Sequence, residues 1–473
     1  MPKQTLRVDE NTTELNARFH QIRAAANVPE SFPSAVEAEA ARVASAPLSL
    51  PDRDETAIPF FTIDPAGSMD LDQAMHLSRD SDGYRVRYAI TYLPAFIAPG
   101  GAIDTEARTR GETIYCPDER TPLHPPVLSE GAASLLPDQV RAAYVWDIAL
   151  DAQGAVTTST IYLARVKSVN RYDYNQVQES IDNGTAEERV ALLKEIGVRR
   201  TAQEAARGGA SLPMPEQEVD RDEDGAYHLT FRPPVPAEEW NAQISLLAGM
   251  VAAKMMVDAK VGILRTMPAP DHAAVQRFRR QAKALGIQWG QDERYGDFLR
   301  RLDRTNPKQL ALIYDATSLF RGASYTPIDG SVPADPEHAA VASIYAHVTA
   351  PLRRLVDRFG LAVCEAIASG SEVPDWARQA LPSLPDIMRR TDSLANSVQR
   401  QCTDAAEAAA LSSHVGQDFD AVIVEQTNKG ALLQLLDPAV VAHAQGPGQP
   451  GDAVRARLTK ADLATGSAQF QIQ

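Results

Sequence analysis

The chain has 473 residues, of which 44% are hydrophobic and 23% charged, and its formal net charge is -15. This composition fits a globular protein large enough for two or three domains, and it excludes a disordered chain. No apolar run of about 18 residues or more occurs, and the first residues lack a hydrophobic signal segment. We therefore expect a cytoplasmic protein that does not associate with a membrane, and we expect it to be a monomer. Cys116, Cys364 and Cys402 are scattered, which argues against a zinc site or a disulfide framework.

The acidic balance disfavours a nucleic-acid partner, because phosphate binding relies on positive surface. Three basic clusters run against that average: RVKSVNR (165–171), RFRR (277–280) and RRLVDR (353–358). Composition alone leaves open that they are solvated helix faces.

The pattern along the chain predicts an α+β protein in three parts: a small helical domain (1–56), a mixed domain (57–415) and a β-barrel (416–473). Residues 11–46 are rich in helix formers, and a proline-punctuated connector (48–60) follows. Strands are expected at 61–64, in a hairpin over 74–93, at 144–151, and in the tail at 419–426, 428–436 and 452–463. Helical spacing marks 186–206, 238–262, 270–285, 295–321, 350–368 and 384–412.

The stretch FFTIDPAGSMDLDQAM (60–75) gathers three aspartates, Asp64, Asp70 and Asp72, with Gln73 closing the cluster. If residues 70–72 are extended, both of their carboxylates point to one side and Leu71 points to the core. Convergent carboxylates repel one another unless a cation lies between them. Oxygen ligands without histidine or thiolate favour Mg²⁺ or Mn²⁺ over zinc. A polar turn with capping aspartates remains an equal alternative from the spacing alone.

A second motif, YAHVTAPLRRLVDRFG (345–360), places Arg353 and Arg354 after a Thr-x-Pro turn. Pro351 suits the first turn of a helix, which would put both arginines at a phosphate-binding helix N-terminus. An arginine pair on a helix is more often a salt-bridged surface face. His347, in the same motif, is interpreted as structural.

Together, TIDPAGSMDLDQA and YAHVTAPLRRLVDR resemble the signature blocks of the RNase II and RNase R (RNB) family of processive 3′-to-5′ exoribonucleases. The segments PGGAIDTEARTRGETIYCPDERTPLHPP, NRYDYNQV and RGGASLPMPEQEVDRDEDG occur between them in the expected order. The similarity covers roughly residues 57–412. It implies an RNB catalytic domain followed by an OB-fold RNA-binding barrel.

The resemblance implies that Asp64, Asp70 and Asp72 hold magnesium and that Arg353 grips the scissile phosphate, with Arg354 beside it on the substrate. Tyr174 falls where the family has an aromatic residue that stacks on the terminal nucleotide, an interaction that tolerates any base. A core tyrosine at the start of a helix is the alternative. Products would be nucleoside 5′-monophosphates and a short limit oligonucleotide.

The sequence departs from the family in three places. Gln73 stands where the family has a fourth aspartate, and Gln399 replaces a glutamate that the family has near the end of the domain. Two groups expected to contact the metal or the substrate are therefore neutral amides. The 63 residues before Asp64 are too few for two cold-shock barrels, and we expect helices there, in a helix-turn-helix-like arrangement as one version. An entry route without those barrels would accept structured or partly duplex RNA.

Three functions compete on this evidence. The leading one is a magnesium-dependent exoribonuclease with single-stranded RNA 3′ ends as its partner. The second is an RNA-binding protein on a catalytically impaired RNB scaffold, motivated by Gln73 and Gln399. The third is a DNA-directed metallonuclease, which is disfavoured because the family reads ribose hydroxyls.

Overall fold

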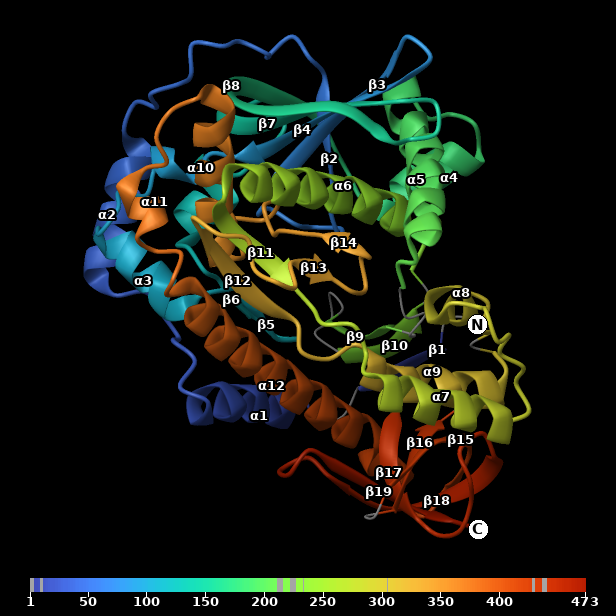
Figure 1. The fold of residues 1–473 in the computed structure, drawn as a ribbon. Helices are drawn as coiled ribbons and strands as arrows, with labels where there is room; N and C mark the ends of the chain where they lie inside the picture. The colour runs from blue at the N-terminus through green and yellow to red at the C-terminus, as the bar shows by residue number, and fades with distance from the viewer. Residues whose placement is uncertain are drawn as a thin grey trace.

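The computed structural model describes residues 4–8, 12–210, 216–221, 227–232, 234–303, 305–427, 430–435 and 440–473. Two closed five-stranded barrels lie far apart in it, joined by helices (Figure 1). The fold is a mixture of helices and strands, as predicted.

The first barrel carries the acidic motif. Its strands are β2 (Phe60–Ile63), β3 (Gln73–Asp80), β4 (Gly83–Thr91), β7 (Val140–Leu150) and β8 (Val156–Tyr172), in the order β2-β3-β4-β7-β8. Strands β2 and β8 close the barrel by pairing in parallel, and the other neighbouring strands pair antiparallel. The predicted hairpin and third strand are confirmed, whereas β8 was not anticipated.

Helices and short strands surround this barrel and carry the rest of the catalytic region. They are α3 (Ala102–Arg110), β5 (Ile114–Tyr115), β6 (Arg120–Thr121), α4 (Tyr174–Asp182), α5 (Glu188–Arg207), α6 (Pro236–Ala259), β11 (Val261–Thr266), β12 (Ser324–Asp329), β13 (Glu337–His338), β14 (Ser343–Ile344), α10 (Leu355–Ser369), α11 (Asp375–Arg378) and α12 (Leu384–Leu411). The main core lies between the barrel and helices α5, α6 and α10, where Tyr88, Trp146, Leu247 and Phe359 are fully buried.

Helix α6 is the one described helix whose length and composition would suit a membrane span. Half of its most apolar window is buried inside the molecule. A core helix of a globular protein has the same properties, so this feature is weak evidence for a membrane.

A smaller helical region follows β11 and consists of α7 (His272–Ala284), α8 (Tyr295–Arg300) and α9 (Pro307–Ala316). It has its own apolar cluster, which includes Phe278, Phe298 and Leu312. The helix predicted over 295–321 is interrupted, because Asn306 caps α9 through its side chain and Pro307 occupies the first turn.

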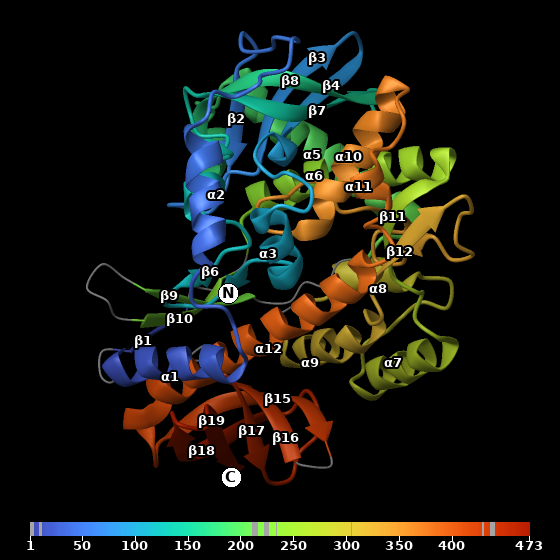
Figure 2. The same ribbon diagram turned by 90° about the vertical axis from the view of Figure 1, so that its left-hand side faces the viewer.

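The predicted N-terminal helices are present as α1 (Thr12–Ala25) and α2 (Ser34–Ser45). Figure 2 shows α1 lying along α12, and Leu15, Phe19 and Ile22 pack there with residues of α12 and the second barrel. Ahead of α1, β1 (Gln4–Val8) joins β9 (Glu216–Arg221) and β10 (Tyr227–Arg232) in a sheet that was not expected.

The second barrel is the predicted C-terminal one. It consists of β15 (Asp418–Thr427), β16 (Gly430–Leu435), β17 (Val441–Gln445), β18 (Ala453–Asp462) and β19 (Ser467–Ile472). Strands β17 and β19, which pair in parallel, were missed. Leu310 of α9 packs with Val422 and Val424 of β15, which attaches this barrel to the α7–α9 region.

Candidate active site

The acidic motif folds as a loop that leaves one buried strand and returns to start the next. All four residues of β2 are buried, and Asp64 follows directly. The turn after it is closed by the hydrogen bond from Ser68 N to Pro65 O (3.1 Å), with Gly67 at φ +84°. Such a positive φ favours glycine. The predicted strand and turn are therefore confirmed.

Asp72 links the two sequence motifs directly. The backbone N–H of Leu352 donates to Asp72 Oδ1 at 2.7 Å, between residues 280 positions apart. Leu71 is fully buried, as predicted, and its N–H donates to Ser134 Oγ at 3.0 Å. These bonds fix the acidic loop against the loop that carries the arginines.

The carboxylates of this loop are costly to ionise. Burial, with repulsion from Asp70, raises the pKa of Asp64 to about 7, and Arg353 and Arg171 oppose the shift. Burial also holds the pKa of Asp72 well above its usual range, against Arg353 and the Leu352 N–H. Two neighbouring carboxylates with raised pKa values, one buried and one half-buried, are typical of a functional site.

Asp70 is held differently. Arg120 of β6 donates to Asp70 Oδ1 at 2.7 Å and also pairs with Glu130 at 2.6 Å. Sequence reasoning missed Arg120, although it lies in the quoted segment IYCPDERTPL. Within the residues that the structure describes, no three His, Cys, Asp or Glu side chains lie close enough together to hold a metal ion. Asp70 is paired with Arg120, and its charge still acts on both Asp64 and Asp72.

The two arginines of the second motif have separate environments. The Arg353 side chain is exposed and makes no hydrogen bond or ion pair with any described residue, yet its charge acts on both Asp64 and Asp72. It is therefore free to bind an anion beside the acidic loop.

Arg354 is tied down. It donates to both oxygens of the fully buried Asp357, at 2.6 and 2.8 Å, and Asp357 Oδ1 also accepts the N–H groups of Thr349 and Ala350 at 2.8 Å each. The helix α10 begins at Leu355, so the expectation that Pro351 starts it was wrong. Arg354 braces the loop on which Arg353 stands, and its role as a substrate contact stays a prediction.

Glu112 is an additional carboxylate beside the arginines, and sequence reasoning did not select it. Its backbone pairs with that of Arg354, and its Oε1 is buried without a hydrogen-bond partner among the described residues. Burial, together with Asp392, raises the pKa of Glu112 to about 7, while Arg354, Arg265 and Arg353 act in the opposite direction.

The two amides lie in different surroundings. Gln73, at the start of β3, accepts a hydrogen bond from the Tyr88 hydroxyl at 2.8 Å, and that hydroxyl also contacts Ser245 Oγ at 2.8 Å. The oxygen of Gln73 is thus already engaged. Gln399 is half-buried on α12, and no hydrogen bond joins it to the acidic loop within the described residues.

Two tyrosines flank the acidic loop. Tyr174 is the first residue of α4, which Asp173 and Gln176 cap reciprocally, and its hydroxyl accepts from Asn241 Nδ2 at 3.3 Å. Tyr115 of β5 is 41% exposed, and desolvation of its hydroxyl and the nearby Asp70 raise the pKa of Tyr115 to about 12. Sequence reasoning missed Tyr115, which offers an exposed ring beside Asp70 and Arg353.

His347 is half-buried, and its Nδ1 lies 2.7 Å from the hydroxyl of Tyr325. Burial and the charge of Arg354 hold the pKa of His347 well below its usual range, so the ring is neutral. This agrees with the predicted structural role.

Comparison with known proteins gives two family matches. Residues 52–362 match the RNB domain, and residues 417–473 match the RNase II-type exonuclease C-terminal S1 domain. The second match covers the C-terminal barrel.

Curated relatives include Ribonuclease R of Mycoplasma genitalium, 25% identical over 408 residues, and Exoribonuclease 2 of Proteus mirabilis, 25% identical over 414 residues. The matches cover 81% and 84% of this chain, and 55% and 63% of those proteins. The chain therefore spans little more than half the length of these relatives.

Among solved structures, M. genitalium RNase R without ligand superposes with a TM-score of 0.86 at 22% identity, covering 97% of this chain and 78% of that one. The same protein is known in complex with ribose-methylated single-stranded RNA and with double-stranded RNA. Yeast Ssd1, described as a pseudonuclease, superposes with a TM-score of 0.68 at 16% identity over 95% of this chain and 57% of that one. These likenesses show the fold.

Proposed function

The chain belongs to the RNB family, and we propose from this premise that it is a metal-dependent hydrolase that shortens RNA from the 3′ end, releasing nucleoside 5′-monophosphates. The observation that carries the proposal is the hydrogen bond between Leu352 and Asp72, which sets the unpaired Arg353 against buried carboxylates. An acidic cluster facing a free guanidinium suits a phosphodiester, whose charge is shared between cation and arginine.

The donor set fits Mg²⁺, with Mn²⁺ as a substitute. Asp64, Asp70 and Asp72 supply only hard oxygen ligands, and the raised pKa values of Asp64 and Asp72 reflect burial and a repulsion from Asp70 that a cation would relieve. Asp70 would exchange its contact with Arg120 for the metal. A bound Mg²⁺ supplies activation of the attacking water and stabilisation of the leaving oxygen.

The chain's own residues supply binding and orientation. Arg353 grips the scissile phosphate, and Arg354 keeps the loop beneath it rigid through Asp357. Tyr174 and the exposed ring of Tyr115 hold the terminal nucleotides by stacking, which is independent of sequence. Gln73, fixed by Tyr88, contributes an amide N–H to the substrate side of the site.

RNA is the proposed partner, entering by a single-stranded 3′ end. M. genitalium RNase R, which has the same fold, is known with both single-stranded and double-stranded RNA. That precedent supports a substrate range that includes duplexes with a 3′ overhang.

A second candidate function is RNA binding without hydrolysis. Gln73 and Gln399 replace carboxylates of the family pattern, Asp70 is neutralised by Arg120, and the pseudonuclease Ssd1 demonstrates that this fold exists without nuclease activity. The two candidates share RNA as ligand and differ only in cleavage.

A 5′-labelled single-stranded RNA of about 30 nucleotides, incubated with Mg²⁺, separates them. We expect a ladder that shortens from the 3′ end to a limit fragment, and the same RNA bound but uncut by Asp72→Asn. The asparagine retains an oxygen that can accept the Leu352 N–H, so the loop keeps its position. RNA that stays intact with the unaltered protein in both Mg²⁺ and Mn²⁺, yet binds, would assign the second function.

A further inference from the structure

The α7–α9 region is positively charged in an otherwise acidic chain. Residues 271–321 hold ten Lys or Arg against six Asp or Glu, although the whole chain has a net charge of -15. The predicted basic cluster RFRR (277–280) lies here on α7. Positive charge that is concentrated on one helix of an acidic protein needs a structural or a functional explanation.

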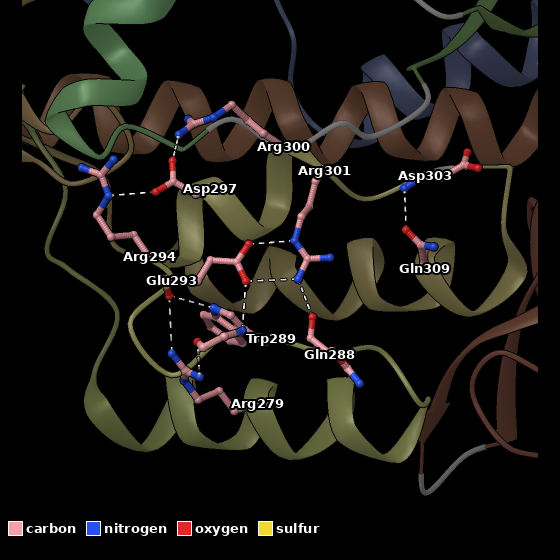
Figure 3. A network of polar contacts seen from close by, with 11 residues as sticks. Arg279, Gln288, Trp289, Glu293, Arg294, Asp297, Arg300, Arg301, Asp303 and Gln309 are labelled. Atoms are coloured by element: carbon pink, nitrogen blue, oxygen red, sulfur yellow. Dashed lines mark hydrogen bonds and ion pairs between the residues drawn. The ribbon is translucent and has the colours of Figure 1, made fainter.

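Part of this charge has a structural explanation, which Figure 3 shows. Arg279 donates to the carbonyl oxygens of Gly290 (3.1 Å) and Gln291 (3.3 Å), and Arg301 pairs with Glu293 at 2.7 Å. Arg294 and Arg300 both pair with Asp297. These arginines fasten the segment between α7 and α8, so their side chains are already engaged in contacts.

Three further cations of α7 and α9 have no such role. Arg280, Lys283 and Lys308 are exposed, and their side chains make no hydrogen bond or ion pair within the described parts of the chain. Arg280 and Lys283 are three residues apart on α7, so they project from one face of the helix. We call these three residues the basic rim.

The basic rim borders the C-terminal barrel. A Cβ placed on Gly451, which precedes β18, would lie 2.8 Å from Leu285 at the end of α7 and 3.0 Å from Lys308 Cγ. Lys283 also lines a surface hollow of about 610 Å³ with Arg279 and Trp289. The rim therefore lies where α7 and α9 approach the barrel, and Lys283 also borders a hollow formed by α7 and the segment that follows it.

The barrel itself supplies little free positive charge. Residues 416–473 hold four Lys or Arg against six Asp or Glu. Arg457 pairs with Asp418 at 2.7 Å, Arg455 lies 3.9 Å from the same carboxylate, and Lys460 pairs with Asp462 at 2.8 Å. Beside the barrel, by contrast, the basic rim offers cations that have no carboxylate partner among the described residues.

We propose that the basic rim binds the phosphodiester backbone of single-stranded RNA upstream of the 3′ end, as an anchor separate from the acidic loop. The inference rests on the proposed function for its ligand, RNA. Both faces of Trp289 are covered, by Arg279 at 4.0 Å and by Phe298 at 4.6 Å. Trp289 in the hollow therefore has no free ring face on which a base could stack. The rim contacts phosphates, which carry no sequence information, so we expect it to bind without sequence preference.

The test measures binding of 5′-labelled oligouridylates of 5 and 30 nucleotides to the full chain in EDTA, over a series of salt concentrations. The variant combines Arg280→Ala, Lys283→Ala and Lys308→Ala. The control combines Arg42→Ala, Lys254→Ala and Arg389→Ala, which removes the same charge from exposed sites on α2, α6 and α12. Thermal unfolding verifies that both variants fold.

We expect the rim variant to bind the 30-mer at least about tenfold more weakly at 0.1 M salt, with a slope of log K against log salt reduced by about 2, since each phosphate contact on a single strand contributes about 0.7. The 5-mer, which reaches only the acidic loop, keeps its affinity. Equal losses for both variants, or equal losses for both oligonucleotides, would overturn the proposal.

Hydrolysis in Mg²⁺ is measured separately, so the two proposals fail in different ways. RNA that is degraded while rim and control variants bind alike overturns the rim alone. RNA that is never degraded, while the rim variant loses affinity for the 30-mer, overturns the exonuclease and supports the rim.

Discussion

The acidic loop and the α7–α9 region treat charge in opposite ways. Asp64 is half-buried and Asp72 is buried, both have raised pKa values, and Arg353, whose charge acts on both, makes no ion pair with a described residue. In the α7–α9 region, by contrast, Arg294, Arg300 and Arg301 each lie on a carboxylate at the surface. Charges that pair with one another hold a fold together. Charges left unsatisfied against their neighbours indicate where a ligand completes the arrangement.

The largest expected effect comes from the arginine of the site that pairs with a fully buried carboxylate. Arg354→Ala would leave Asp357, which is fully buried, without its cation, and breaking a buried ion pair costs about 3–5 kcal/mol. We expect this loss in the free energy of unfolding, measured in urea with and without RNA. Arg354→Lys, which restores charge but not the two parallel bonds, should recover part of it. An unchanged midpoint for Arg354→Ala would contradict the bracing role.

Arg353→Ala should behave in the reverse manner. Its exposed side chain makes no hydrogen bond or ion pair with a described residue. We therefore expect the free energy of unfolding to stay within about 0.5 kcal/mol of that of the unaltered protein. Single-turnover cleavage should slow by about 10²–10³, as for the loss of one donor to transition-state charge. A variant that unfolds easily, or that cleaves normally, would remove the contrast between these adjacent arginines.

Glu112 tests whether burial or the neighbouring arginines have the larger effect on the pKa of a carboxyl group at this site. Its folded-state pKa is raised to about 7, so the folded form binds more protons than the unfolded form between the usual glutamate pKa and pH 7. The stability contribution is therefore complete at low pH and is lost as pH rises through 7. We expect Glu112→Gln to raise Tm by about 2 °C or more at pH 8 and to give no gain near pH 4.

The exposed Glu37 of α2 provides the matched control. Glu37→Gln should leave Tm unchanged at both pH values. A gain for Glu112→Gln that is independent of pH would show that the arginines already compensate its charge.

The smallest effect is expected in the α7–α9 region. Arg301→Ala removes an ion pair with Glu293 at the surface and a contact 4.7 Å above the Phe298 ring. Exposed pairs contribute about 0–1 kcal/mol, so the free energy of unfolding should fall by less than about 1 kcal/mol, without change in cleavage rate. A loss as large as that of Arg354→Ala would show that the two regions do not differ as described.

Much of the fold follows from local patterns, and the exceptions have physical causes. The hairpin of β3 and β4 alternates in polarity, and its register agrees with that pattern. Strand β8 was missed because its first five residues, Val156–Thr160 in the chain, are all exposed and polar or small apart from the valine. Its identity depends on pairing with β7, which a local pattern does not report.

The site, like the fold, has residues that the sequence predicted and residues that it did not. Clustering in sequence identified Asp64, Asp70, Asp72 and Arg353, because these residues lie in two short motifs. Arg120, Glu112 and Tyr115 lie between the two motifs in the chain and reach the site through tertiary contacts, which only their coordinates reveal. The positions of Gln73 and Tyr174 in the chain were foreseen, but their partners Tyr88 and Asn241 were not.

The bond between Leu352 and Asp72 also has a consequence for how the protein is made. Its partners are 280 residues apart, so at 5–20 residues per second they leave the ribosome roughly 14–56 s apart. During that interval the nascent chain carries the acidic loop without its arginine. If the proposed activity holds, the growing chain is harmless to the messenger that encodes it, and the ability to cut RNA arrives only when translation is well advanced.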